Sequence, residues 1–438
     1  MQIDNTTYAD LSVFQTVDEY SLFGILDRTR TIGGRIQLLD FFNHPFSDIE
    51  KIRQTQEILT IIQSHEAEWA PSISNGTIMV MERFYETPLD KIPSSSDPLR
   101  ARMYQILHAP DYSLTRYSVS HFADFIRGMF SIISIGKKLS FPAMLQTLLD
   151  RADNLLRPAV IQAMSLKKSG EKLQPAEVIQ FGSFIRNKFR SSALTLIEIY
   201  GRLDAWYSMA VAGREFQLVT PDIEDSDMPF IEVKALHHLL LPKAIRYDVH
   251  MDPRSNFIFL TGANMAGKST FIKAVGSALF LAHLGMGVPA EKMRTSLFDG
   301  ILSNINVVDN LVKGESYFFN EVQRIRNTIL KISDKKKWLV LIDELFKGTN
   351  VEDAMKCSTT VIKGLIKIKS SLFILSTHLY EIGEELKVFP NICFKYFETG
   401  IENGQLQFPY QLKDGISNDR LGYLILEREK VVELLDKL

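Results

Sequence analysis

Cysteine is scarce in this chain. Only Cys357 and Cys393 occur among 438 residues, which excludes a disulfide framework and favours a reducing compartment. The chain also lacks any apolar run near the length of about 18 residues that a membrane-spanning helix needs. Residues 1–8 are polar and lack the apolar core of a signal peptide. These absences predict a cytoplasmic protein without a membrane partner.

A surplus of positive charge is missing as well. The 50 lysines and arginines face 52 aspartates and glutamates, for a formal net charge of −2. A protein that binds nucleic acid tightly on its own usually carries a basic face, so any contact with DNA must come from local patches. Internal repeats and low-complexity segments are absent too, and the length leaves room for two or three globular domains.

The most informative segment is residues 262–269, Gly-Ala-Asn-Met-Ala-Gly-Lys-Ser. It fits the G-x-x-x-x-G-K-[ST] pattern of a phosphate-binding loop, with a strand-like run before it and a helical pattern after it. The glycines let successive backbone N–H groups point at an anion, Lys268 would reach the β- and γ-phosphates, and Ser269 would bind Mg²⁺. A chance glycine turn capped by Ser269 is the alternative, but the flanking elements favour a nucleoside triphosphate site.

A second segment predicts hydrolysis. Residues 338–342, Trp-Leu-Val-Leu-Ile, are apolar throughout, as in a buried parallel strand, and Asp343 and Glu344 follow at its carboxyl end. Asp343 would hold Mg²⁺ through water, and Glu344 would orient or deprotonate the attacking water. Both carboxylates could instead cap a helix, but the upstream phosphate loop favours the catalytic interpretation.

A third strand-like run, residues 372–376, ends in Thr377 and His378. A histidine at this end of a strand can sense the γ-phosphate by hydrogen bonding. On its own, such a Thr-His pair is more often a surface or core pair whose hydrogen bonds are already satisfied. Its place as the third element of an ordered series of motifs favours the functional interpretation.

The chain divides in composition near residues 217–229. Before this linker nearly everything has helical periodicity, including one long helix expected from Pro175 to about Phe216. After it, short apolar strands alternate with helices, as in a sheet with crossover connections. We therefore predict a helical domain over residues 1–225 and an α/β domain over residues 226–438.

The order of these motifs resembles that of the MutS family of DNA mismatch repair ATPases. Residues 261–270, Thr-Gly-Ala-Asn-Met-Ala-Gly-Lys-Ser-Thr, are similar to the family's phosphate loop. Residues 313–318 resemble its Gly-x-Ser-Thr-Phe signature, and residues 342–350 its Asp-Glu-x-x-x-Gly-Thr-Ser segment, whose Gly348-Thr349-Asn350 part resembles the D-loop that faces a partner subunit. Residues 26–35 and 44–50 resemble the start of the family's helical core.

The resemblance implies an all-helical core and lever domain followed by an ABC-like P-loop ATPase domain, with ATP and Mg²⁺ as cofactors. Hydrolysis would need a homodimer, in which Ser316 of one chain reaches the γ-phosphate held by the other. The catalytic residues would be Glu344, Lys268 and His378, and the metal would be held by Ser269 and Asp343. The nucleotide-binding residues would be Gly262, Ala263, Asn264, Met265, Ala266, Gly267, Lys268, Ser269, Thr270 and Ser316.

Some residues depart from the family pattern. Ala263 replaces a proline and Tyr317 a threonine, and where the family stacks an aromatic residue on adenine this chain has Ala244 and Ile245, with Tyr247 nearby. The chain starts at the part that resembles the core, so we expect a member without the mismatch-reading domain. Phe84-Tyr85-Glu86 fits that domain's Phe-x-Glu wedge, but the pattern also occurs at Phe230 and Phe319 and is interpreted as a coincidence.

The expected function is an ATP-dependent DNA-binding ATPase in mismatch repair or a related DNA-structure transaction. Two alternatives stay open: a family member specific for branched or recombining DNA, and an ABC-type ATPase subunit with a non-DNA partner. The chain has no Leu-Ser-Gly-Gly signature, which argues against the latter. Basic residues cluster in the helical half, where a solvated helix face and contact with DNA phosphates are both open: Lys167, Lys168, Lys172, Arg186, Lys188 and Arg190.

Overall fold

The computed structural model describes residues 1–15, 20–69, 72–94, 97–136, 139–305, 317–402, 405–417 and 434. It contains both helices and sheets, and its contacts separate the chain into two units. One unit comprises residues 1–25, 45–52 and 216–438, and the other comprises residues 26–44 and 53–215. None of the described helices combines the length and the hydropathy needed to span a bilayer.

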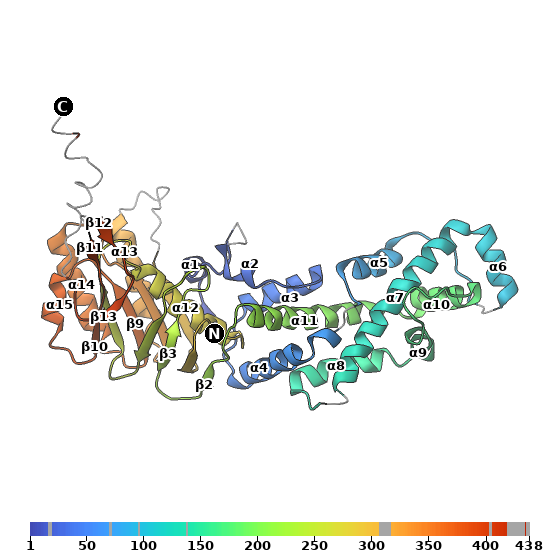
Figure 1. The fold of residues 1–438 in the computed structure, drawn as a ribbon, viewed down its shortest axis with the longest axis horizontal. Coiled ribbons are helices and arrows are strands. Elements are labelled where there is room, and N and C mark those ends of the chain that lie inside the picture. The colour runs from blue at the N-terminus through green and yellow to red at the C-terminus, as the bar shows by residue number, and fades with distance from the viewer. Residues whose placement is uncertain are drawn as a thin grey trace. The chain divides into compact units, whose positions relative to one another are not determined.

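The first unit is built on a mainly parallel sheet (Figure 1), whose strand order is β1-β7-β8-β9-β5-β10-β13. Only β13 pairs in an antiparallel sense, with β10. The strands β5, β8 and β9 are buried at every position, which explains their uniformly apolar sequences. The strand bounds are β1 Gln2–Ile3, β5 Phe257–Thr261, β7 Gly300–Asn304, β8 Trp338–Asp343, β9 Ser371–Ser376, β10 Ile392–Phe397 and β13 Leu412–Asp414.

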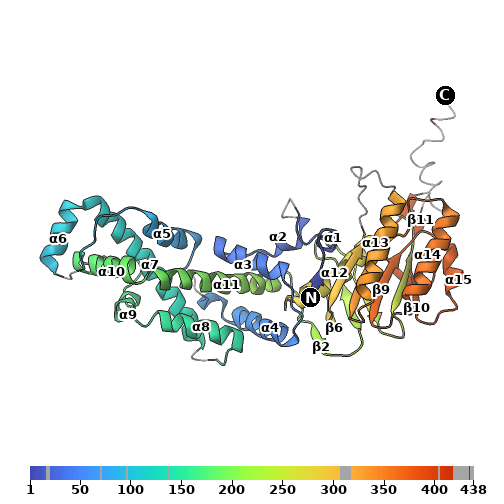
Figure 2. The same ribbon diagram turned by 180° about the vertical axis from the view of Figure 1, so that it is seen from behind.

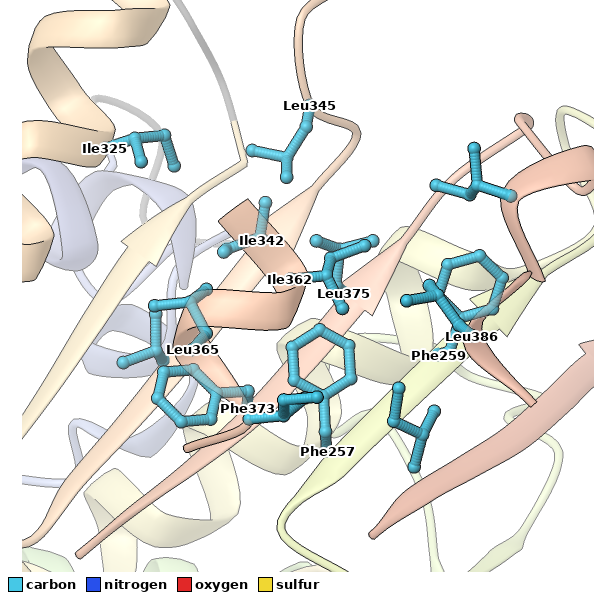
Figure 3. Packing of buried hydrophobic residues seen from close by; sticks show 14 of the residues in the cluster. Phe257, Phe259, Ile325, Ile342, Leu345, Ile362, Leu365, Phe373, Leu375 and Leu386 are labelled. Atoms are coloured by element: carbon cyan, nitrogen blue, oxygen red, sulfur yellow. The ribbon is translucent and has the colours of Figure 1, made fainter. Parts of the chain in front are cut away.

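Helices cover both faces of this sheet. One face packs against α13, α14 and α15 through a cluster of buried aromatic and aliphatic side chains, in which Phe257 and Phe373 stack (Figure 3). The other face packs against α12, where Gly276 lies close to Leu341 of β8 and to Leu11. The helix bounds are α1 Asn5–Asp10, α12 Lys268–His283, α13 Tyr317–Ile332, α14 Val351–Leu365 and α15 Glu381–Leu386.

The first residues of the chain belong to this α/β unit, whereas the sequence analysis assigned residues 1–225 to the helical domain. Strand β1 extends the sheet by pairing with β7, and the buried carboxylate of Asp10 accepts hydrogen bonds from the Ser303 hydroxyl at 2.6 Å and the Ile305 N–H at 2.9 Å. The N-terminal ammonium donates to the Pro45 carbonyl at 2.6 Å. These contacts bring residues 1–25 and 45–52 into the α/β unit.

A second, four-stranded sheet in the same unit has the order β2-β6-β3-β4. It leads the chain from the helical unit toward the phosphate loop, since β4 ends only a few residues before β5 begins. A small hairpin follows β10. The bounds are β2 Asp222–Glu224, β3 Ile231–Leu236, β4 Tyr247–Met251, β6 Lys292–Ser296, β11 Gly400–Glu402 and β12 Gln405–Gln407.

The other unit consists of helices in its described residues (Figure 2). The long helix predicted from Pro175 to about Phe216 is two helices, α10 and α11, which meet at Phe189. Phe189, whose buried ring stacks on Phe184 of α10, forms the C-cap of α10 although phenylalanine has no breaker character. The bounds are α3 Ile32–Asn43, α4 Ile49–Ser64, α5 Asn75–Glu86, α6 Pro98–Leu107, α7 Ala109–Gly136, α8 Ala143–Leu155, α9 Ala159–Ser165, α10 Pro175–Lys188 and α11 Arg190–Glu215. The short helix α2 Leu22–Leu26 and the first turn of α4 fall in the α/β unit.

A buried carboxylate joins α11 to the start of α3. Asp204 accepts hydrogen bonds from the backbone N–H groups of Arg30 and Thr31 and from the Thr31 hydroxyl, at 2.7–3.1 Å. Burial raises the pKa of Asp204, which these hydrogen bonds and the Arg30 charge partly offset. The side chain leaves so little room that a Cβ at Gly34 would collide with it, so glycine is required there.

Candidate nucleotide-binding site

The phosphate loop connects β5 to α12, as its sequence predicts. Gly262 and Gly267 have φ angles of 140° and 108°, which a residue with a side chain rarely adopts. At Gly267 a Cβ would also lie 3.3 Å from the Tyr410 ring. Met265 takes a φ of 67° and is 79% exposed, so its side chain points away from the core. The loop thus ends at the N-terminus of α12, where backbone N–H groups favour an anion.

Lys268 begins α12 and is folded back onto the loop. Its ammonium donates to the carbonyls of Gly262 at 2.8 Å and Ala263 at 3.0 Å. Burial lowers the pKa of Lys268, and the carboxylates of Glu344 and Asp343 oppose that effect. A phosphate group bound by the loop would supply the negative charge that this buried ammonium lacks at contact distance.

Asp343, at the end of β8, lies between two hydroxyls. The Ser269 hydroxyl donates to one of its carboxylate oxygens and the Ser376 hydroxyl donates to the other. Parallel pairing of β8 with β9 places Asp343 opposite Ser376, and the loop after β5 brings Ser269 to the same edge. A carboxylate beside a hydroxyl is a set of oxygen ligands that suits Mg²⁺. The predicted metal ligands Ser269 and Asp343 are therefore in direct contact.

Glu344 lies one residue beyond β8 with a φ of 64°, and its N–H donates to the Ser376 carbonyl at 2.9 Å. Its carboxylate lies 3.1 Å from the Lys347 ammonium and 3.6 Å from Nδ1 of His378. Burial raises the pKa of Glu344, but the hydrogen bond to His378 and the charge of Lys347 outweigh it, so the pKa falls to about 2. At neutral pH Glu344 is therefore a carboxylate that can accept a hydrogen bond from water.

The loop after Glu344 is held by a residue that the motif search missed. The carboxylate of Glu321, buried on α13, accepts hydrogen bonds from the N–H groups of Lys347 at 3.2 Å and Gly348 at 3.3 Å. Asn350 then caps α14 by accepting from the Asp353 N–H at 3.0 Å. Burial raises the pKa of Glu321. The only sequence signal was an acidic residue at a core-facing position of an amphipathic helix, which is unusual.

A cavity of about 550 Å³ lies over the phosphate loop, large enough for a nucleotide. Beside Lys268, Ser269, Asp343 and Glu344, its lining carries apolar and aromatic groups. Ile245 is 43% exposed and Tyr410 is 41% exposed, whereas Tyr247 is buried edge-on against Phe271 and Phe397. Ile245 and Tyr410 thus offer a nucleobase more exposed surface than Tyr247 does. The sequence analysis missed Tyr410 because it lies far along the chain from the phosphate loop.

The structure brings Gly262–Thr270, Asp343, Glu344 and His378 to one edge of the sheet. Their chemical roles stay predictions. Ser316 and most of the signature segment lie outside the described residues.

The basic residues of the helical unit differ in whether they are already engaged in contacts within the protein. The Arg186 guanidinium donates hydrogen bonds to the carbonyls of Phe84 and Thr87. A separate cavity of about 780 Å³ has five cationic residues in its lining, namely Arg116, Arg127, Lys167, Lys168 and Lys172. Within the described residues, Arg127 and Lys167 form ion pairs, and the other three do not. We call this cavity the basic groove.

A family model and individual relatives both relate this chain to DNA mismatch repair proteins. Residues 258–433 match the family model for MutS domain V. The chain is 28% identical over 254 residues to the DNA mismatch repair protein MutS of Thermotoga maritima, covering 57% of this chain and 31% of that protein. Similarity to the DNA mismatch repair protein MSH3 of Vanderwaltozyma polyspora is 30% identity over 256 residues, covering 56% of this chain and 25% of the relative. The chain therefore matches about a third or less of the length of these relatives.

Proposed function

Because the chain belongs to the MutS family, we propose that it is an ATPase that binds DNA and couples this binding to ATP hydrolysis, in mismatch repair or a related DNA-structure transaction. The observation that carries the proposal is the contact between Ser269 and Asp343 beside the phosphate loop, with Glu344 next along the chain. These groups lie at the carboxyl edge of a parallel sheet, where nucleotide ligands bind in folds of this class.

Each residue has a distinct role in this proposal. The loop N–H groups and Lys268 bind the phosphates, and Ser269 with Asp343 holds Mg²⁺, which neutralises charge on the β- and γ-phosphates. Glu344 orients water or accepts its proton, and His378, whose Nδ1 lies 3.6 Å from the Glu344 carboxylate, responds to the γ-phosphate. Lys347 has to release Glu344 if the carboxylate is to act as a base, because their ion pair stabilises the charged form.

A complete site would need two chains. The proposal places Ser316 of one chain against the γ-phosphate held by the other, in a homodimer with two-fold symmetry. The fixed geometry of the loop after Glu344, held by Glu321, would then present Gly348 to the partner. ATP would act as a link between the subunits, and its hydrolysis would release them.

The basic groove supports DNA over a non-DNA partner. Arg116, Lys168 and Lys172 line one cavity and form no ion pair within the described residues, so they can bind phosphates without first breaking a salt bridge. The exposed Tyr117 lies in the same lining. Such contacts would read the DNA backbone and not the base sequence, which also suits the alternative of branched DNA, where more phosphates converge on one site.

The candidate wedge Phe84 does not favour mismatch reading by this chain. Its ring is 1% exposed and packs edge-on against Phe122, with the Arg186 guanidinium nearby. A wedge must be exposed to enter a base step. We therefore expect a G·T duplex and its matched control to bind within about threefold of each other, less than about 0.7 kcal/mol.

The test is a pair of titrations, one with nucleotide and one with DNA. The chain should bind ATP in a Mg²⁺-dependent manner, and it should bind duplex DNA with an affinity that falls steeply with salt. Replacing Lys168 and Lys172 together with glutamate should lower DNA affinity at least tenfold and reduce the salt slope by about 2. Lys188→Glu, on α10 and outside the groove lining, is the matched control. Equal losses in both variants would remove the groove from the proposal.

A further inference from the structure

Three metal-ligand side chains meet at the corner between α6 and α7. His108 lies between these helices, Asp111 is in the first turn of α7, and Asp90 lies in the segment that follows α5. One ligand atom from each of the three lies within 4.8 Å of the other two. Nδ1 of His108 is 2.9 Å from an Asp90 carboxylate oxygen, and the Asp90 N–H donates to Asp111 at 3.0 Å.

The spacing is close to what a metal ion requires. Four ligands at about 2.0–2.2 Å from an ion in a tetrahedral site are about 3.3–3.6 Å apart. The three ligand atoms lie within 4.8 Å of one another, and all three residues lie outside the helices or in a first helical turn. The partial exposure of His108 and Asp111 leaves room for water as a further ligand.

A buried hydroxyl provides a second, independent observation. Tyr104 is 5% exposed, and its hydroxyl has no hydrogen-bond partner among the residues that the structure describes. The Tyr104 ring stacks on the His108 ring with centroids 4.8 Å apart. A buried polar group without a partner is costly, and a water held by a metal ion at this corner would provide one.

The charges at the corner are unbalanced. Neither Asp90 nor Asp111 forms an ion pair with a lysine or arginine of the described residues. The nearby Arg186 is committed to the carbonyls of Phe84 and Thr87. Two adjacent carboxylates without a lysine or arginine partner repel each other, and a divalent cation would offset this repulsion.

We propose that Asp90, His108 and Asp111 bind a divalent transition-metal ion. One imidazole and two carboxylates form a nitrogen and oxygen ligand set that suits Zn²⁺ or Co²⁺, whereas Mg²⁺ and Ca²⁺ prefer oxygen ligands alone. Bound metal fastens the segment after α5 to the α6–α7 corner. The site is independent of the proposed ATPase, because it uses none of the nucleotide-binding residues.

The experiment measures metal binding by the whole chain without nucleotide. After chelator treatment, Co²⁺ should bind in a 1:1 ratio with a visible absorption band, and Zn²⁺ should displace it and raise the melting temperature. His108→Asn and Asp111→Asn should each weaken binding at least tenfold, since the first removes the imidazole ligand and the second the negative charge of a carboxylate ligand. Asparagine at 111 can still accept from the Asp90 N–H, so the fold should survive. If Asp111→Asn does not fold, Asp90→Asn takes its place.

Two control variants make the result specific. His44 lies 2.9 Å from Asp40, as His108 does from Asp90, but it belongs to no group of three ligands within the described residues. His44→Asn should therefore leave Co²⁺ binding unchanged, and so should Asp343→Asn, which removes the proposed Mg²⁺ ligand. The proposal is overturned if the parent protein binds no Co²⁺ in a 1:1 ratio, or if His108→Asn binds it as tightly as His44→Asn does.

Discussion

Replacing Glu344 with glutamine tests the assignment of the water-activating residue. Glutamine has nearly the same shape, so it removes the charge and leaves the strained backbone at φ 64° and its hydrogen bond to Ser376 in place. The side chain of Glu344 is 14% exposed and contacts Lys347 and His378. The variant therefore removes one negative charge from a site whose other parts, the phosphate loop and Asp343, are unchanged.

The expected magnitudes for stability and catalysis differ widely. Lys347 is 39% exposed, so its ion pair with Glu344 is screened by solvent and contributes no more than about 1 kcal/mol to stability. A positioned general base contributes about 10²–10⁴-fold to the rate. Glu344→Gln should thus fold and bind ATP as the parent does, while hydrolysis falls by about 10²–10⁴-fold.

Single-turnover hydrolysis and equilibrium ATP binding, measured on the same preparation, separate the two effects. Glu384→Gln is the matched control, because Glu384 is an exposed carboxylate that also pairs with a lysine, Lys387 at 2.7 Å. It should hydrolyse ATP at the parental rate. Parental hydrolysis in the Glu344 variant would refute the assignment, and loss of ATP binding would mean that Glu344 acts in binding and not in turnover.

Three further predictions concern ATP binding, the shared site and pH-dependent stability. Lys268→Ala should abolish tight ATP binding, because the phosphates lose their main side-chain partner; unchanged affinity in an equilibrium titration would contradict this. Asp343→Asn and Ser316→Ala chains, each inactive alone, should recover activity when mixed, in the one site formed from the two intact halves, and verified heterodimers without recovery would argue against a shared site. His283 is fully buried with its pKa lowered by burial from 6.5 to about 4, and its Nε2 accepts the Phe298 N–H. The unfolded chain therefore takes up the proton first as pH falls from 6.5 toward 4, so His283 should contribute about 2 kcal/mol to the fall in unfolding free energy between pH 7.5 and pH 5. A His283→Gln variant that shows the same fall as the parent in chemical denaturation would contradict this.

The sequence predicted those parts of the fold and site that depend on local patterns. The phosphate loop is recognisable because its glycines and Lys268 act through backbone geometry next to them in the chain. Asp343 and His378 could be placed because parallel strands expose their carboxyl ends at one edge, whatever the strand order. Mixed helix and sheet followed from the change in periodicity near the linker.

Other features depend on contacts between distant residues and left no local signal. Strand β1 has two residues, too few for an alternating pattern, and it joins the sheet through β7. Helix α10 ends with the buried Phe189 as its C-cap, although phenylalanine is not a helix breaker. Glu321 and Tyr410 reach the site from other elements, and only the folded chain reveals their partners.

The central claim is that this chain couples ATP hydrolysis to DNA. The most direct test measures the ATPase rate of the chain with Mg²⁺ alone and in parallel with matched duplex, G·T duplex and four-way DNA. We expect Mg²⁺-dependent hydrolysis that DNA changes, with the two duplexes acting alike and four-way DNA acting at least as strongly. No hydrolysis, or a rate that none of the three DNAs alters while Glu344→Gln abolishes it, would contradict the claim.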